Sequence, residues 1–135
     1  MSAVVTIEEI PVHRDSRGWV FEPLEPAALP DQRNVHLGLS EPGAVRGNHY
    51  HVQGTEVVVV IGPVLVRYRE GSRVRDIAVP EGKAFRFTFP PGVPHAIQNT
   101  GSYPSPIIAF NSELHDRANP DVAGEILISP PGSRG

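Results

Sequence analysis

The sequence predicts an all-β protein, and three observations carry this prediction. Segments in which apolar and polar residues alternate recur at a spacing of roughly 8–12 residues, as is typical of β-sandwiches and barrels. The 13 Gly and 15 Pro are scattered without a period, which is typical of turns between short strands. The run 57–61 is apolar without interruption, as expected of a strand covered on both faces. A chain of 135 residues has the length of one domain.

The expected strands follow one another between clear turn signals. Gly, Pro, Asp and Ser, the residues that favour turns, gather at 15–18, 41–43, 70–72, 80–82, 90–92 and 100–102. The segments between these turns are rich in β-branched and aromatic residues, which favour strands. In order, the expected strands span residues 4–12, 19–23, 34–40, 45–51, 56–61, 64–69, 73–79, 84–89, 95–99 and 106–111, with a last strand at 125–128.

Two segments fall outside the strand pattern. Residues 22–32 have room for one short helical turn. Residues 129–135 are rich in Pro, Gly and Ser and predict a loose C-terminal tail. We therefore expect a single domain over residues 1–128, with an N-terminal strand extension, followed by the tail 129–135.

Composition excludes several functional classes. A net charge of −3 argues against nucleic-acid binding, which normally needs a clustered basic face. The absence of Cys excludes disulfides, thiolate metal sites and cysteine nucleophiles. The sequence contains no apolar run near the ~20 residues that span a bilayer, and its N-terminus lacks the pattern of a secretion signal. We therefore expect a cytoplasmic protein with no membrane or nucleic-acid partner.

Three of the six histidines lie in two patches that suit a metal site. His49 and His51 are two residues apart, so on a strand both side chains point to one face. Glu56 follows across a short turn, and His95 lies on a distant strand that joins them only if the sheet closes. Three imidazoles and one carboxylate suit a divalent first-row metal.

The two patches resemble the sequence motifs of the cupin family, G-x5-H-x-H-x3-4-E-x6-G and G-x5-P-x-G-x2-H-x3-N. The first motif matches over 43–62, with five residues rather than six in its last gap, and the second over 82–99, with seven rather than five in its first gap. The resemblance implies a double-stranded β-helix, which is a jelly-roll barrel. It also implies one divalent transition metal (zinc, nickel, iron or manganese) bound by His49, His51, Glu56 and His95.

A narrower resemblance covers roughly residues 15–122. The stretches 46–51 (RGNHYH), 90–101 (PPGVPHAIQNTG), 111–113 and 119–121 resemble the C-terminal cupin domain of capsular-polysaccharide enzymes that epimerise a UDP-linked 4-keto-6-deoxy amino sugar. The stretches 15–22 and 45–50 also resemble dTDP-4-keto-6-deoxyhexose 3,5-epimerases and 3,4-ketoisomerases. This resemblance implies a small-molecule substrate, a nucleotide-linked 4-keto sugar.

The sequence departs from the capsular enzymes in two ways. Those enzymes have Lys where this chain has Arg46, and an Arg side chain, with a pKa above about 12, is a poor proton shuttle. They also carry a reductase domain, whereas the loop G-x-G-x-x-G that binds dinucleotides does not occur in this sequence. We therefore expect no nucleotide cofactor.

A 4-keto sugar is epimerised through an enolate, which needs a base and a positive charge near the enolate oxygen. The catalytic candidates are Arg46, His49 and Tyr50, although strict alternation places Tyr50 outside the barrel and Arg46 opposite His49 unless Gly47 permits a bulge. His49 is either a metal ligand or the base, since one imidazole nitrogen cannot do both. The candidates for substrate binding are Arg46, Asn99, Asn111 and His36.

Three functions remain open at this point. The first is a metal-dependent epimerase or isomerase of a nucleotide-linked keto sugar. The second is a metal-dependent dioxygenase, because cupins of that class share a site of three His and one Glu. The third is a non-catalytic cupin that binds a sugar or a metal. For all three we expect a homodimer, because the extended residues 4–12 offer a sheet edge that is costly to leave open.

Overall fold

The computed structural model describes residues 4–132. In this part of the chain, twelve β-strands and one short 3-10 helix follow one another. Their bounds are β1 (Thr6–Ile10), β2 (His13–Asp15), β3 (Gly18–Val20), η1 (Pro26–Asp31), β4 (Asn34–Ser40), β5 (Val45–His51), β6 (Glu56–Ile61), β7 (Val64–Glu70), β8 (Arg73–Val79), β9 (Ala84–Phe89), β10 (His95–Asn99), β11 (Ser105–Asn111) and β12 (Val122–Gly124).

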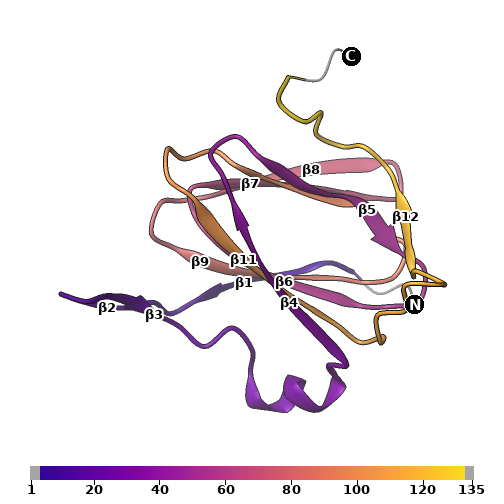
Figure 1. Ribbon diagram of the computed structural model, residues 1–135, viewed down its shortest axis with the longest axis horizontal. Helices are drawn as coiled ribbons and strands as arrows, with labels where there is room; N and C mark the ends of the chain where they lie inside the picture. Colours follow the sequence, from indigo (N-terminus) through magenta and orange to yellow (C-terminus); the bar gives the residue numbers. More distant parts are fainter. Residues whose placement is uncertain (1–3, 133–135) are drawn as a thin grey trace.

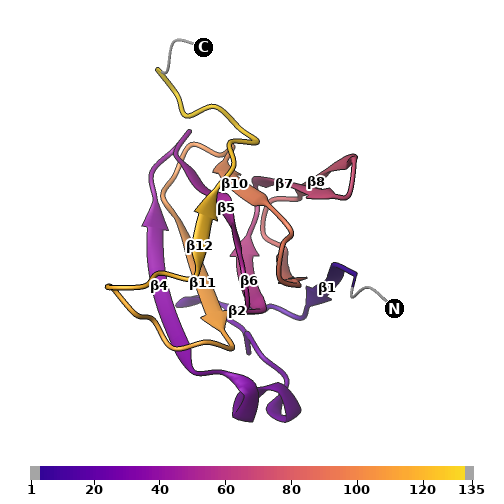
Figure 2. The same ribbon diagram turned by 90° about the vertical axis from the view of Figure 1, so that its right-hand side faces the viewer.

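Two five-stranded antiparallel sheets face each other and form the barrel (Figure 1). One sheet has the order β1-β9-β6-β11-β4, and the other has the order β12-β5-β10-β7-β8. Figure 2 shows β4 and β8 at opposite borders of the barrel. Neighbouring strands come from distant parts of the chain, as in a jelly roll, so the expected all-β cupin fold is confirmed.

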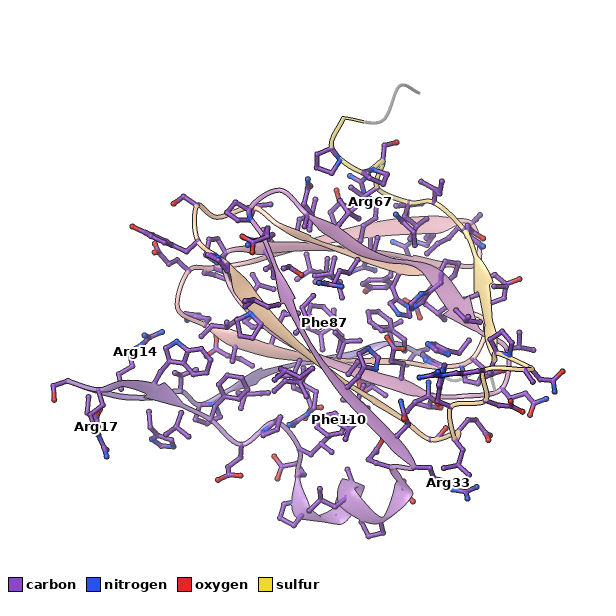
Figure 3. The ribbon with its side chains drawn as sticks, viewed as in Figure 1. Arg14, Arg17, Arg33, Arg67, Phe87 and Phe110 are labelled. Atoms are coloured by element: carbon purple, nitrogen blue, oxygen red, sulfur yellow. The ribbon has the colours of Figure 1, made fainter. Side chains whose placement is uncertain are left out.

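The sheet that contains β6 is covered on both faces. All six residues of β6 are buried: Val58 and Val60 pack between the sheets, whereas Val57 and Val59 pack against the N-terminal segment. Figure 3 shows Phe87 between the two sheets and Phe110 on the side where η1 lies. This two-sided burial explains why residues 57–61 carry no polar position.

The N-terminal segment covers the outer face of that sheet and then projects from it. β1 pairs with β9, and Ile10 joins the outer apolar cluster. The hairpin of β2 and β3 extends beyond the barrel (Figure 1), and all of its residues are exposed. The strand predicted at 19–23 is wrong beyond Val20, because the chain turns there and buries Leu24 in the outer cluster. The helical turn expected within 22–32 is confirmed as η1.

The strand predicted at 125–128 is wrong, and the last strand is β12 instead. β12 pairs with β5, with Val122 opposite His51. Residues 125–128 form no strand ladder. Glu125 N donates to the backbone carbonyl of Asn48, and the Asn48 amide accepts from Leu127 N and Ile128 N and donates to Ile128 O. No helix among residues 4–132 is long and apolar enough to cross a membrane.

Candidate functional site

A bulge in β5 sets the direction of its polar side chains. Against β10, Gly47 lies opposite Ala96 and His49 opposite His95, so Asn48 is an extra residue on β5. Gly47 and Asn48 have φ angles of +89° and +56°, in the left-handed region that favours Gly and tolerates Asn. A Cβ at Gly47 would lie 2.7 Å from the carbonyl oxygen of His95. Only glycine therefore fits this bulge, which brings Arg46 and His49 to the same cavity.

The four residues predicted to bind a metal meet at one end of the barrel. His51 Nε2 forms a very short contact with Glu56 Oε2, and His95 Nε2 lies 3.0 Å from Glu56 Oε1. His49 Nε2 lies 4.0 Å from the same Oε1 atom. One potential ligand atom from each of His49, His51 and Glu56 lies within 4.8 Å of the other two. Residues 49, 51 and 95 come from two adjacent strands of one sheet, and Glu56 comes from the facing sheet.

Burial and charge single out Glu56. Its residue is 5% exposed, and this burial raises the pKa of its carboxyl group. Hydrogen bonds with His51 and His95, together with the nearby ring of His49, lower that pKa by more, so the net pKa lies well below the usual range of Glu. For His51, burial lowers the pKa, but the bonded Glu56 carboxylate raises it to a net value above the ordinary pKa. The carboxylate is therefore ionised in the cluster.

The donor set fits a divalent transition metal. His95 Nδ1 lies 3.0 Å from the carbonyl oxygen of Val93, and since a carbonyl only accepts, Nδ1 carries the proton and Nε2 faces Glu56. This is the arrangement typical of a metal-binding His, whose second nitrogen donates to a carbonyl or carboxylate. The ring also stacks on Phe89, with centroids 4.0 Å apart, and this contact fixes its plane.

Two cavities lie beside the cluster. The inner cavity, of about 70 Å³, lies between the sheets, and the mouth cavity has about 360 Å³. Both are lined by His36 and Glu56. The inner cavity also contacts Arg46, Gly47, His49 and His95. The mouth cavity also contacts Asn34, His51, Asn111, Glu113, Leu114, His115, Asp116, Pro120, Asp121 and Val122.

The other predicted site residues divide into two groups. Arg46, His36 and Asn111 line the cavities. Arg46 donates to Ser40 Oγ and to the carbonyl oxygen of Leu39. The second group, Tyr50 and Asn99, lies outside both of these cavities. Tyr50 lines neither cavity, because alternation along β5 turns it away from both histidines.

Asn99 lies at the opposite end of the barrel, where its amide bonds only backbone groups. It donates to the carbonyl oxygens of Ser40 and Tyr103 and accepts from Gly101 N. Since its polar atoms are occupied and it is 2% exposed, the geometry gives it a structural role outside the two cavities at the cluster, and its contact with substrate stays a prediction.

Sequence reasoning missed the acidic side of the mouth. Glu113, Asp116 and Asp121 line it together with His115. The carboxylate of Asp121 accepts from Gln53 N and Gly54 N, so it also orders the turn between His51 and Glu56. These residues follow β11 in a segment without strand periodicity. The only available signal was that 111–113 and 119–121 belonged to the stretches that resembled the capsular enzymes.

Comparison with known sequences identifies the family to which the chain belongs. The sequence model of the polysaccharide biosynthesis C-terminal domain matches residues 13–123. A Pseudomonas aeruginosa protein named UDP-2-acetamido-2,6-beta-L-arabino-hexul-4-ose reductase is 32% identical over 117 residues. That match covers 84% of this chain and 31% of the relative, so the chain spans about a third of the relative's length.

Solved structures give the same fold. CapF from Staphylococcus aureus, a capsular polysaccharide assembling protein, is 27% identical with a TM-score of 0.64, and the match covers 86% of this chain and 32% of CapF. The dTDP-4-dehydrorhamnose 3,5-epimerase from Sulfolobus tokodaii has a TM-score of 0.71 at 19% identity, over 94% of this chain and 81% of the epimerase. The sugar 3,4-ketoisomerase QdtA from Thermoanaerobacterium thermosaccharolyticum has a TM-score of 0.67 at 17% identity, and the match covers 88% of this chain and 86% of QdtA. The last two matches establish the fold alone.

Proposed function

Because this chain belongs to the polysaccharide biosynthesis C-terminal domain family, we propose that it is a metal-binding enzyme of nucleotide sugars. Its reaction is the epimerisation or isomerisation of a nucleotide-linked 4-keto sugar through an enolate. The observation that carries the proposal is the cluster of three histidines around the ionised Glu56, open to a cavity that Arg46 also lines. The functional unit is the single domain 1–128, followed by a C-terminal tail.

The cluster assigns a task to each residue. His51, Glu56 and His95 are buried or nearly so, and with His49 they would hold one divalent metal, which supplies positive charge to an enolate oxygen. His49 has the most accessible ring of the three, with 30% of its side chain exposed, so it lies nearest to a substrate in the cavity. Arg46 offers a guanidinium, which binds phosphate or carbonyl oxygen through paired N–H groups. A 4-keto group acidifies the neighbouring C–H bond, so a base beside that bond can form the enolate.

Metal content tests the first half of the proposal. We expect about one zinc, nickel, iron or manganese per chain in tag-free protein, measured by mass spectrometry, and its loss in His95→Ala. His49→Asn separates the two roles of His49. A variant that loses the metal identifies a ligand, whereas one that keeps the metal and loses turnover identifies the base. A protein that takes up none of these metals contradicts the metal assignment.

Solvent exchange tests the second half. TDP-4-keto-6-deoxyglucose, the sugar bound to a QdtA variant, and a UDP-linked 4-keto-6-deoxy amino sugar are incubated with the metal-loaded protein in deuterated water. Enolisation replaces the hydrogen next to the keto group by deuterium, which NMR detects. Arg46→Met is expected to slow this exchange, and Arg73→Met, on the outer strand β8, is the matched control. Failure to exchange either sugar contradicts the enzymatic proposal.

The acidic mouth favours a second, non-catalytic candidate. Among residues 4–132, Arg46 is the only Lys or Arg that lines either cavity, whereas Glu113, Asp116 and Asp121 line the mouth. A diphosphate is bound best by several cations, so this lining favours a protein that binds a sugar or a metal without turnover. Stabilisation of the folded protein by a sugar nucleotide, with no deuterium exchange, is the expected result for this candidate.

The proposal includes a homodimer in the cytoplasm, and both stay predictions. β1 borders its sheet, and an open strand edge is a site of pairing. Val35, Leu37 and Leu39 are exposed along the other border strand, β4. Sedimentation at micromolar concentration is expected to give the mass of two chains, and a clean monomer would contradict the dimer.

A further inference from the structure

Asn111 touches His51 from the facing sheet. It lies directly opposite Glu56 in the ladder between β11 and β6, so both side chains enter the same end of the barrel. Asn111 is 9% exposed, and its Nδ2 lies 3.3 Å from His51 Nδ1. A Cβ at Gly54 would lie 2.3 Å from Asn111 Oδ1, so only glycine at 54 leaves room for this amide.

A backbone N–H fixes which way the amide faces. Glu113 N lies 2.8 Å from Asn111 Oδ1, and because a backbone N–H only donates, the atom facing it must be the amide oxygen. The amide nitrogen, which also only donates, then faces His51. The acceptor in that contact is His51 Nδ1, which therefore carries no proton. In a neutral ring the proton must lie on Nε2, where Glu56 Oε2 accepts it.

We propose that Asn111 is a positioning residue that selects the Nε2–H form of neutral His51. The hydrogen bonds run in one direction, from Glu113 N–H to Asn111, from Asn111 to His51 and from His51 to Glu56. This inference concerns the same site as the proposed function and rests on it for the role of His51. It also distinguishes two histidines that the sequence motif does not separate: the Val93 carbonyl holds a proton on Nδ1 of His95, whereas the Asn111 amide leaves Nδ1 of His51 without one.

Metal binding at His51 then has a structural requirement. A metal binds the unprotonated Nε2, which places the proton of a neutral ring on Nδ1. The Asn111 amide must turn over to accept that proton, and this removes its bond to Glu113 N–H. The Asn111 amide therefore opposes metal binding at His51, whereas a carboxylate at position 111 would favour it.

Asn111→Asp tests the assignment with a side chain of the same shape. One carboxylate oxygen still accepts from Glu113 N–H, and the other replaces the donor with an acceptor facing His51. The protonation of each ring nitrogen is read from 15N chemical shifts of His51 in metal-free protein at alkaline pH, where the ring is neutral. We expect Nδ1 to be unprotonated in the wild type and protonated in the variant. A protonated Nδ1 in the wild type, or no change in Asn111→Asp, overturns the proposal.

Asn34→Asp is the matched control. Asn34 lies opposite Asn111 in the ladder between β4 and β11 and lines the same mouth cavity, so it adds the same charge without touching His51. We expect the wild-type nitrogen shifts in this variant, and the shifts of Asn111→Asp in Asn34→Asp would overturn the proposal by making charge alone the cause.

Zinc affinity gives an independent measurement. Titration of zinc against a competing chelator is expected to show binding about 10-fold tighter in Asn111→Asp than in the wild type or Asn34→Asp. Equal affinities contradict the inferred opposition to metal binding. If no variant binds zinc, the metal part of the proposed function fails, and the nitrogen shifts decide the tautomer assignment by themselves.

Discussion

The two ends of the barrel use buried polar residues in opposite ways. Asn99 and Ser105 lie at the end near the β2–β3 hairpin, and each bonds only backbone groups. At the other end, Glu56, His95 and His51 bond chiefly one another. The same strands β6, β10 and β11 run through both ends, so the contrast arises from the terminal residues and not from the scaffold.

This contrast separates stability from function. Side chains that complete the bonds of nearby backbone groups remove unsatisfied polar atoms and hold loops in place. Side chains that bond one another around a cavity keep a charge buried. A buried charge lowers the stability of the folded protein unless each of its partners is present. The polar residues at the end with Asn99 therefore stabilise the fold. The residues at the end with Glu56 place imidazole and carboxylate groups beside a cavity.

The largest expected effect comes from the two buried asparagines, which form a matched pair. Asn99→Ala leaves three backbone partners without a bond, each costing about 1–3 kcal/mol, so we expect a loss of about 3–5 kcal/mol in the free energy of unfolding. Asn111→Ala releases one backbone N–H and one ring nitrogen, and for these two partners we expect a smaller loss of about 2–3 kcal/mol. Denaturant titration of metal-free protein measures both. Equal losses would remove the distinction between the ends.

A substitution in the bulge of β5 tests how far the end of the barrel with Glu56 depends on the left-handed backbone at Gly47. Gly47→Ala places a Cβ against the carbonyl oxygen of His95 in a left-handed conformation, and we expect a cost of about 2–3 kcal/mol together with weaker metal binding. Gly71→Ala is the control, because its φ is +59° but a Cβ meets nothing within 4 Å. We expect it to cost about 1 kcal/mol and to leave metal binding unchanged. If the two variants cost the same, contact with His95 contributes nothing.

The sequence predicted the strands of this fold better than the direction of its side chains. Strands β4, β5, β6, β8, β9 and β10 have the predicted bounds, because turn residues and apolar periods mark both of their ends. The C-terminal strand was misplaced, since residues 126–128 are apolar but are held by Asn48 and not by a ladder.

Spacing predicted that His49 and His51 point to the same side, because two residues two apart on a strand share a face. The resemblance to the cupin motifs added Glu56 and His95 to the same cluster, and that the cluster binds a metal stays a prediction. Spacing does not reveal what a third strand adds. The contact of Asn111 with His51 depends on the register between β11 and β6, which no local pattern contains. Asn99 is equally polar in the sequence, and only its surroundings separate its role from that of Asn111.

Acid tests the buried charge at the site end. The pKa of Glu56 is lower in the folded protein than its ordinary value, so its stabilising contribution is complete above about pH 4, the pKa in an unfolded chain. It is lost as the pH falls below that value, because the unfolded chain then binds the proton more readily. We expect the difference in unfolding free energy between the wild type and Glu56→Gln to shrink below about pH 4 in metal-free protein.

Glu113→Gln is the control for this measurement. Glu113 lines the mouth of the same cavity, and the structure records no bond from its carboxylate to a histidine of the cluster. We expect its curve of unfolding free energy against pH to run parallel to that of the wild type. A difference that stays constant in Glu56→Gln through the acid range would show that the histidines do not hold its charge.

The smallest effect on stability is expected at Arg46, which lines the inner cavity but is exposed. Its guanidinium bonds Ser40 Oγ through Nε and the Leu39 carbonyl through a terminal nitrogen. Lys keeps the charge but offers a single point donor in place of this fork, so Arg46→Lys is expected to change the unfolding free energy by no more than about 1 kcal/mol. We expect the same variant to weaken binding of a nucleotide sugar about 10-fold, measured by calorimetry, since a bidentate contact is lost. If the free energy of unfolding falls by as much as in Asn99→Ala, the role of Arg46 is to stabilise the fold, as it is for Asn99, and not to bind a substrate.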